Sequence, residues 1–344
     1  MESKKLYQFI ILGLGSIGKR HAEFLNSFNE QLICIDPNQD ARDWANNKFK
    51  KSVKVLSSLE DASEIISNCS LKKIGVIANW GTLHYQSAKF LTKLGVTNLY
   101  IEKPIANSLK AIDWLKNLSN DIKVIGGFQN RYTKIHEKIL EISLEKLGGP
   151  PSMIVVDGGA AGMVTNGIHF LDLAISIFES APISVTSALS SSNINPRSKD
   201  LDFWEGSASW SFQNKRFLSI NFTNYSSVRQ TTEIFCPKGK IKINEDMSID
   251  VYERDKEEIL ADNRIIRLGK AYKINETSVK PNNEEAFKRI FEPLFNKNIE
   301  INRNRELIAT KAMIYALIAS QQKKTLSMNE KVEDSLYDFK WKIS

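Results

Sequence analysis

The sequence predicts an α/β protein with two domains, a doubly wound parallel sheet followed by an α/β domain with a large, mostly antiparallel sheet. Three observations predict this class. A glycine-rich turn directly follows an apolar run near the N-terminus, apolar runs alternate with amphipathic segments through the first third, and strand-like segments follow one another without helices in the second half. At 344 residues the chain is long enough for two domains. We place the boundary after the sixth apolar run and expect domains at residues 1–125 and 126–344.

The alternation in the first third defines the expected strands and helices. The expected strands are residues 7–12, 32–35, 53–56, 74–78, 98–101 and 122–125. The expected helices are residues 19–28, 41–46, 59–67, 82–94 and 108–118. This order indicates right-handed crossovers and a parallel sheet covered on both faces. Ligands of such sheets bind beyond the carboxyl ends of the strands, so the residues just after each run are the candidates for function.

The glycine-rich turn has the spacing G-x-G-x-x-G and follows Leu12. Gly13 permits the tight turn, Gly15 lets a pyrophosphate approach the backbone, and Gly18 lets the next helix pack closely on the strand. The N–H groups at the start of that helix also favour phosphate. An ordinary strand-turn-helix is the alternative. We expect a Rossmann domain that holds a dinucleotide through Gly13, Gly15, Ser16, Ile17 and Gly18.

An acidic residue ends the second expected strand. Asp36 lies 23 residues after Gly13, close to the spacing expected for a carboxylate that binds the ribose hydroxyls. Such a carboxylate repels a 2′-phosphate, so it favours NAD over NADP, although the nearby Arg42 partly offsets this preference. The alternative is that Asp36 is a turn or cap residue.

Polar side chains also follow the fourth expected strand. Asn79 and Trp80 would border the nicotinamide half of the cofactor, and Thr82 is placed to cap the following helix. His84 lies in the first turn of that helix, where its ring either reaches the ligand or only satisfies the loop. Trp80 either walls the pocket or simply packs.

Glu102-Lys103-Pro104 follows the fifth expected strand. A lysine at the end of a strand can hydrogen-bond a substrate hydroxyl and favour its ionised form. Two opposite charges directly after a buried strand, followed by a proline, are unusual for plain structure, and a surface ion pair is the alternative.

The second half begins with an expected helix at residues 132–147 and a strand at 153–157, and His169 starts an apolar helix at 168–178. The expected strands that follow are residues 183–189, 206–212, 216–221, 231–236, 240–244 and 248–251, with a polar loop at 193–202. Without intervening helices, such strands are expected to pair antiparallel. Two closing helices, at 281–295 and 306–321, and a last strand at 336–343 complete the chain.

Five short motifs match, in order and spacing, those of a known family. They are residues 13–21, 83–84, 102–106, 127–132 and 167–172. On these motifs the sequence resembles the Gfo/Idh/MocA oxidoreductases, which include glucose–fructose oxidoreductase and inositol dehydrogenases. The resemblance implies a Rossmann domain, a C-terminal α/β domain with a large sheet, a nicotinamide cofactor, and sugars, cyclitols or nucleotide sugars as substrates.

The resemblance also implies roles for residues of the second half. His169 becomes a proton acceptor that acts together with Lys103, and no metal is needed. The candidate substrate-binding residues are Arg131, Thr165, Asn166, His169 and Asp172. The main departure is Thr165, which stands where the family commonly has an aspartate, because threonine cannot exchange a proton at neutral pH. A second departure is Asn79-Trp80-Gly81, where the family usually has Thr-Pro-Asn.

We therefore expect an NAD(H)-dependent oxidoreductase that acts on a secondary hydroxyl or ketone of a sugar-like substrate. The cofactor-binding residues expected besides the glycine turn are Asp36, Asn79, Trp80, His84, Glu102 and Lys103. The alternative is a sensor or regulatory protein that binds NAD and a sugar without reacting them. A Rossmann dehydrogenase of an amino-acid pathway would share the first domain but would not explain Lys103 together with His169.

Composition bears on the remaining classes of function. The net charge of +7 is spread along the chain without a basic block interleaved with aromatics, so no nucleic-acid partner is expected. No apolar run approaches the 18 residues or so of a membrane span, and no signal peptide is evident before the first strand. The spacing of Cys34, Cys69 and Cys236 fits no zinc site or redox pair, which favours structural thiols in the cytoplasm. We expect a homodimer or homotetramer that associates through the C-terminal sheet.

Overall fold

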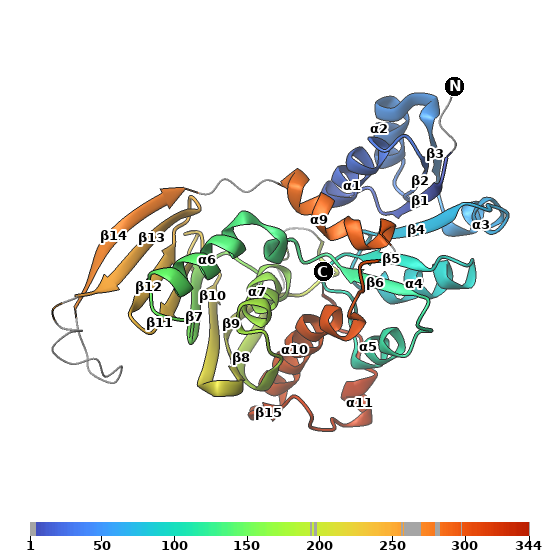
Figure 1. The fold of residues 1–344 in the computed structure, drawn as a ribbon. Helices are drawn as coiled ribbons and strands as arrows, with labels where there is room; N and C mark the ends of the chain where they lie inside the picture. The colour runs from blue at the N-terminus through green and yellow to red at the C-terminus, as the bar shows by residue number, and fades with distance from the viewer. Residues whose placement is uncertain are drawn as a thin grey trace. The chain divides into compact units, whose positions relative to one another are not determined.

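The computed structural model describes residues 5–192, 195, 198–255, 257, 270–278, 283–296 and 298–343 (Figure 1). The chain divides into two compact units. Unit 1 comprises Met1–Gly127, Phe287–Thr310 and Tyr337–Ser344, and unit 2 comprises Phe128–Ala286 and Lys311–Leu336. Unit 1 thus takes in two segments from the C-terminal third, and the single boundary after residue 125 stays a prediction.

Unit 1 is built on a six-stranded parallel sheet with the order β3-β2-β1-β4-β5-β6. The strands are β1 (Tyr7–Leu12), β2 (Gln31–Ile35), β3 (Val53–Leu56), β4 (Lys72–Ile77), β5 (Asn98–Ile101) and β6 (Lys123–Gly126). The connecting helices are α1 (Ser16–Asn26), α2 (Gln39–Phe49), α3 (Leu59–Ser67), α4 (His84–Lys93) and α5 (Leu109–Lys116). The expected alternation is confirmed, and the strand order reverses between β1 and β4, the position at which such sheets bind ligands.

Aromatic packing joins a C-terminal helix to this sheet. Phe295, at the end of α9 (Asn283–Phe295), packs edge-on against Tyr7 and Phe9 of β1, at centroid distances of 5.4 and 5.9 Å. Phe291 stacks on the Tyr100 ring of β5 at 4.7 Å. The helix expected at 281–295 is confirmed over 283–295, while residues 281–282 lie outside the described residues.

Unit 2 contains a nine-stranded sheet with the order β14-β13-β12-β11-β7-β10-β9-β8-β15. The strands are β7 (Met153–Gly159), β8 (Pro182–Ser192), β9 (Phe203–Phe212), β10 (Arg216–Thr223), β11 (Thr231–Cys236), β12 (Gly239–Ile243), β13 (Ser248–Arg254), β14 (Ala271–Ser278) and β15 (Leu326–Ser327). The expected antiparallel pairing holds for every pair except β7 with β10, which run parallel.

The two faces of this sheet differ in burial. Ile154, Leu218 and Ile234 lie on one face and are buried, and α6 (Lys134–Glu145) and α7 (Ile168–Phe178) lie over that face in Figure 1. The opposite face carries partly exposed side chains, among them Phe217, of which 47% is exposed. Trp210 is fully buried and donates its indole N–H to the carbonyl of Ala312, so it packs in the core.

Three expectations near the C-terminus and in the sheet need correction. The strand expected at residues 336–343 is wrong, because a short helix, α11 (Asp334–Tyr337), covers its first two residues and residues 338–343 form no strand. Trp341 instead donates its backbone N–H to the carbonyl of Asn107, which fixes the segment without strand pairing. The strands β14 and β15 were not expected from the pattern, whereas α10 (Arg303–Gln322) was. Among the described residues, no helix is long and apolar enough to cross a membrane.

Candidate functional site

The glycine turn after β1 meets two steric requirements of the fold. Gly13 has a φ of +92°, and a Cβ atom there would lie 2.6 Å from the backbone of Asn79. A Cβ atom at Gly18 would lie 1.9 Å from the carbonyl oxygen of Gly13. Glycine is therefore required at both positions for packing within the protein itself, whether or not a ligand binds.

Gly15 differs, because its α-carbon faces open space. An added Cβ would meet no atom within 4 Å, and the φ of −66° is one that any residue adopts. Gly15 also caps α1, whose first turn has no capping side chain and no acidic residue. An uncapped helix start beside open space fits a phosphate group. The turn therefore fits the pyrophosphate of a dinucleotide at Gly15, Ser16, Ile17 and Gly18.

Asp36 is held at the carboxyl end of β2, next to this turn. Its carboxylate accepts hydrogen bonds from the backbone N–H of Leu14 at 2.6 Å and of Asn38 at 2.8 Å. Arg42 donates to the carbonyl oxygens of Asp36 and Pro37, at 2.8 and 2.7 Å. Asp36 therefore does act as a turn residue, as the alternative stated. Its hydrogen bonds also fix the carboxylate beside the glycine turn, where the ribose of a dinucleotide would lie.

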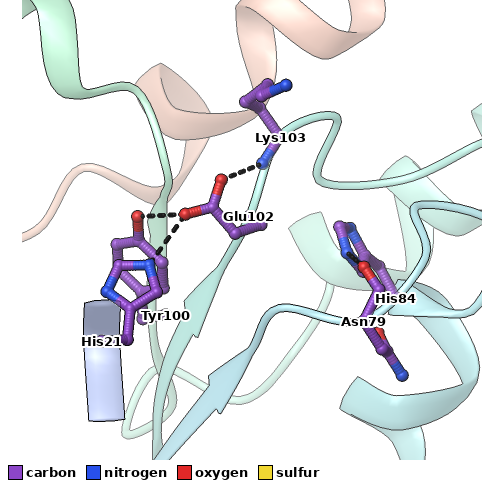
Figure 2. Close-up of polar contacts among 6 residues, drawn as sticks. All are labelled: His21, Asn79, His84, Tyr100, Glu102 and Lys103. Atoms are coloured by element: carbon purple, nitrogen blue, oxygen red, sulfur yellow. Dashed lines mark hydrogen bonds and ion pairs between the residues drawn. The ribbon is translucent and has the colours of Figure 1, made fainter. Parts of the chain in front are cut away.

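Glu102, directly after β5, lies in a buried polar cluster (Figure 2). Only 6% of the residue is exposed, and its Oε1 atom lies 2.9 Å from His21 Nε2 and 2.8 Å from the Tyr100 hydroxyl. Its Oε2 atom accepts the backbone N–H of Lys103 at 3.3 Å. The surface ion pair given as the alternative is wrong for Glu102, because its carboxylate is buried and bonds inward.

The cluster keeps Glu102 ionised. Burial by itself raises the pKa of Glu102, but the hydrogen bond from His21, nearby positive charge and the Tyr100 hydroxyl together lower it to about 2. Gly127 makes room for the cluster, because a Cβ atom there would lie 2.8 Å from Glu102 Oε2 and 2.9 Å from the Tyr100 oxygen.

Sequence reasoning missed three members of this cluster, namely His21, Tyr100 and Gly127. Two of them lie inside motifs that the sequence analysis had singled out, His21 in residues 13–21 and Gly127 in residues 127–132. Their fixed position within those motifs was the available signal, but His21 lies 81 residues from its partner Glu102 in the chain.

His84 lies at the start of α4 and is only 1% exposed. Its Nδ1 atom lies 2.8 Å from the carbonyl oxygen of Pro104, and its Nε2 atom lies 3.0 Å from that of Asn79. Burial lowers the pKa of His84, against the effect of these two carbonyl oxygens. The ring therefore satisfies the loops after β4 and β5, and a direct contact with a ligand stays a prediction.

Other residues after β4 are partly as expected. Thr82 does not cap α4, since the N-cap residue is Leu83 and no side chain caps the helix. The Asn79 amide donates to Ser87 Oγ at 2.9 Å, which fixes its side chain against α4. Trp80 is 45% exposed, so its indole is available to a ligand.

In unit 2, a π-helical turn at Met163–Gly167 leads directly into α7. It carries two candidate residues, Thr165 and Asn166, and the Asn166 side chain accepts the backbone N–H of Gly162 at 3.2 Å. Single π-helical turns are often found at functional sites. His169 is the second residue of α7, so the turn sets the position of its side chain.

One turn further along α7, Asp172 forms an ion pair with Arg131 of the short 3-10 helix Gln129–Tyr132. Arg131 Nη1 lies 3.4 Å from Asp172 Oδ1, and the two side chains are only 8% and 1% exposed. The Arg131 guanidinium also lies over the rings of Phe128 and Tyr132, at 5.8 and 5.1 Å. His169 and Asp172 are three residues apart, so they share one face of α7. Arg131 therefore pairs with a carboxylate within unit 2, and its binding of a substrate stays a prediction.

We predict that Glu102→Gln weakens the acid sensitivity of the fold. Since its pKa of about 2 lies below the ordinary 4.5, ionised Glu102 stabilises the fold above about pH 4.5, and this contribution disappears as the pH falls from 4.5 to 2. Its size is roughly 3 kcal/mol. The variant should be less stable at pH 7, and its stability should fall less steeply below pH 4.5, as measured by urea unfolding across a pH series.

Asp246→Asn is the matched control for this prediction. Asp246 is exposed and its pKa is lowered mainly by hydrogen bonds from Ser248, so its substitution should change the slope little. Equal slopes for Glu102→Gln and the wild type would contradict the role of the buried carboxylate.

Comparisons with known proteins agree with this geometry. Residues 7–126 match the Gfo/Idh/MocA family model, described as an oxidoreductase family with an NAD-binding Rossmann fold. A search of the curated proteins found no match.

Solved structures resemble nearly the whole chain. An oxidoreductase from Agrobacterium radiobacter, in complex with NAD⁺, L-tartaric acid and magnesium, is 14% identical with a TM-score of 0.70, over 94% of this chain and 99% of that one. The transcriptional regulator Gal80p from Kluyveromyces lactis is 14% identical with a TM-score of 0.71, over 96% of each chain. Scyllo-inositol dehydrogenase from Lactobacillus casei, with bound NAD(H) and scyllo-inositol, is 16% identical with a TM-score of 0.64, over 95% of this chain and 100% of that one.

At these identities the structures show a common fold and no more. Residues 7–126 thus match the NAD-binding Rossmann fold of that family model, and the chain as a whole has the fold of these solved proteins.

Proposed function

We propose that the chain is, over its full length, a Gfo/Idh/MocA oxidoreductase that transfers hydride between NAD(H) and a secondary alcohol or ketone of a sugar, nucleotide sugar or cyclitol. The observation that carries the proposal is the uncapped start of α1 beside open space at Gly15, in the domain that matches the family model. The nicotinamide, when bound, accepts or supplies the hydride. The chain's own residues bind it, orient the substrate and move the proton.

The proposed cofactor is NAD, with NADP disfavoured. Asp36 presents a fixed carboxylate that accepts ribose hydroxyls, and the Arg42 guanidinium is engaged with backbone carbonyls, which reduces its capacity to bind a 2′-phosphate. Asn79, Trp80, Glu102 and Lys103 follow β4 and β5, where the nicotinamide half of a dinucleotide would lie.

Lys103 and His169 are the proposed catalytic residues. In the direction of oxidation, His169 accepts the hydroxyl proton of the substrate, and Lys103 stabilises the developing alkoxide through its positive charge. Arg131, Thr165, Asn166 and Asp172 are proposed to bind the substrate. The burial of the Arg131–Asp172 pair supports an orienting role for both.

Sugar-like substrates are supported by the chemistry of the candidate residues and by the solved proteins of this fold. Amide, hydroxyl, guanidinium and carboxylate groups suit a ligand with many hydroxyls. Two of the similar proteins hold polyhydroxylated molecules, L-tartaric acid in one and scyllo-inositol in the other.

A protein that binds NAD and a sugar without reacting them is the second candidate function. Thr165 favours this function, because threonine cannot exchange a proton as the family's usual aspartate does. The similarity in fold to a transcriptional regulator, Gal80p, shows that this fold also serves regulation. The two functions can be distinguished experimentally. The purified protein is incubated with NAD and a panel of sugars and cyclitols, and absorbance at the nicotinamide band is measured.

The second sheet is the proposed surface for self-association into a homodimer or homotetramer. Its outer face presents Met153, Val155, Phe217 and Phe235 on three neighbouring strands, all of them partly or largely exposed. A contiguous apolar area on a sheet face is typical of an interface.

We also propose a cytoplasmic location, because Cys34, Cys69 and Cys236 are free thiols.

The first prediction of this proposal concerns Gly15→Ala. Since the added methyl group points into open space, the apo protein should lose at most about 1 kcal/mol of stability. The same methyl group would occupy the place of the pyrophosphate, so the dissociation constant for NADH, measured by fluorescence titration, should rise at least about tenfold. Gly18→Ala is the contrasting variant, because its Cβ clashes with Gly13 and the fold itself should fail. Unchanged NADH affinity in Gly15→Ala would argue against the proposed cofactor position.

The second prediction concerns catalysis. Lys103→Ala and His169→Ala should each lower turnover by about 10²–10⁴-fold while NADH still binds. Lys116→Ala, at an exposed lysine of α5, is the control and should keep full turnover. Turnover within about threefold of the wild type in either variant would remove that residue from the catalytic role.

The third prediction concerns self-association. Phe217→Glu should lower the molar mass measured by light scattering to that of a monomer, because it places a charge in the apolar area of the sheet. Phe339→Glu is a matched control, since Phe339 is 46% exposed but belongs to unit 1. An unchanged mass for Phe217→Glu would place the interface elsewhere.

A further inference from the structure

Two buried histidines contact the residues on either side of Lys103 in the sequence. His21 of α1 is fully buried and contacts Glu102, the residue before Lys103, with 2.9 Å between His21 Nε2 and Glu102 Oε1. His84 of α4 is 1% exposed and contacts Pro104, the residue after Lys103, with 2.8 Å between His84 Nδ1 and the Pro104 carbonyl oxygen. Figure 2 shows both imidazoles beside the loop, while the Lys103 side chain extends away from the Glu102 carboxylate.

On the first side, the hydrogen bonds form a chain that reaches the Lys103 backbone. His21 and the Tyr100 hydroxyl fix Glu102 Oε1, and Oε2 accepts the N–H of Lys103 at 3.3 Å. Aromatic rings hold His21 in turn, with Tyr100 at 4.8 Å and Phe287 at 4.9 Å between centroids. Because the carboxylate has donors on both oxygens, it has one strongly preferred orientation.

On the second side, one ring connects two loops. His84 lies within hydrogen-bond distance of the Pro104 carbonyl after β5 and of the Asn79 carbonyl after β4. The ring therefore fixes the separation of the two segments that carry Lys103 and Asn79. A neutral imidazole carries one N–H, so it donates to one of these two carbonyl groups and packs against the other. An apolar side chain at this position would leave that buried carbonyl group without its donor, at a cost in free energy.

The burial of both rings argues against direct catalysis by either one. A ring that is 0–1% exposed cannot readily exchange protons with solvent or reach a substrate. Both rings instead contact residues within one position of Lys103. A displacement of a catalytic group by about 1 Å can cost about 10²-fold in rate, so a catalytic lysine on a loop needs support of this kind.

We propose that His21 and His84 are positioning residues, which hold the Glu102–Pro104 segment from its two sides and so fix the place of the Lys103 amine. The catalytic consequence rests on the proposed function of Lys103. Neither histidine contacts the reacting atoms. They act through Glu102 on one side and through the Pro104 carbonyl on the other.

The test compares substitutions that remove the imidazole with substitutions that keep an N–H donor. His21→Leu and His84→Leu remove it, whereas His21→Gln and His84→Gln retain an amide donor of similar reach. Leu91→Ala is the control, because Leu91 is a fully buried residue of α4 whose loss should lower the melting temperature without disturbing the loop. Each protein is assayed with NAD and a panel containing scyllo-inositol, myo-inositol and glucose, and its NADH affinity is measured by fluorescence.

We expect both leucine variants to lower kcat by about 10–100-fold, with KM and the NADH dissociation constant within about threefold of the wild type. The glutamine variants should recover a large part of kcat, and Leu91→Ala should keep it. A readout without substrate is hydrogen exchange at the Lys103 amide, which should become at least tenfold faster in the leucine variants and stay unchanged in Leu91→Ala.

The outcomes separate this inference from the proposed function. If Lys103→Ala abolishes turnover while both leucine variants keep kcat within threefold, the inference is wrong and the proposed function stands. If the wild type turns over no compound of the panel, or if Lys103→Ala keeps its turnover, the proposed function is contradicted. The catalytic consequence of the two histidines is then contradicted as well. Hydrogen exchange then still decides whether the histidines hold the segment, and an unchanged rate at the Lys103 amide would overturn that part as well.

Discussion

A single buried carboxylate, that of Glu102, is the constraint on which the arrangement of unit 1 depends. A carboxylate removed from water is costly unless its oxygens receive hydrogen bonds, and Glu102 receives them from α1 (His21), from β5 (Tyr100) and from the Lys103 backbone. Helix α1 and the segment after β5 are thereby joined through the Glu102 side chain. Gly127, after β6, leaves the space that the carboxylate needs. The consequence for the proposed function is that the lysine proposed to act on the substrate directly follows a buried residue held by hydrogen bonds on both carboxylate oxygens.

The glycine turn illustrates how one motif combines two physical requirements. Gly13 and Gly18 are needed by the protein, because a Cβ atom at Gly13 would overlap backbone atoms of the segment after β4 and one at Gly18 would overlap the turn itself. Gly15 is not needed by the protein, since a Cβ atom there would meet nothing. A glycine that the fold does not require, placed at the uncapped start of a helix, is best explained by a ligand that occupies the space. The three identical residues therefore have different consequences when they are substituted.

In unit 2, helix α7 gathers the polar residues that the proposed function assigns to the substrate. A π-helical turn holds Thr165 and Asn166 directly before it, His169 lies in its first turn, and Asp172 pairs with Arg131 one turn later. The pair is almost completely buried, so Asp172 has a structural role in holding the arginine as well as any role toward a ligand. With Thr165 in place of an acid, the proposed proton transfer rests on His169, and for this reason a sensor that binds without reacting is the second candidate function.

The sequence alone determined the order of elements and the local chemistry, because both depend on neighbours in the chain. Apolar periodicity predicted the six strands of the first sheet, and the spacing of Gly13, Gly15 and Gly18 predicted the turn for a dinucleotide. It failed for residues 336–343, where Trp341 and Ile343 are buried without pairing in a strand and the Trp341 backbone N–H donates to Asn107 of the same unit. The sequence also predicted that Thr82 caps α4, whereas the N-cap residue is Leu83.

Only the tertiary structure decided which side chains meet across long separations. His21 and Glu102 are 81 residues apart, and His84 and Pro104 are 20 apart, so no local pattern states that both histidines serve the loop of Lys103. The same holds for Gly127, whose need to be glycine comes from Glu102 and Tyr100 on a neighbouring strand. The sequence named Lys103 as a candidate because it follows a strand. The fold decided how that lysine is held, because burial and hydrogen-bond geometry exist only once the strands and helices have packed.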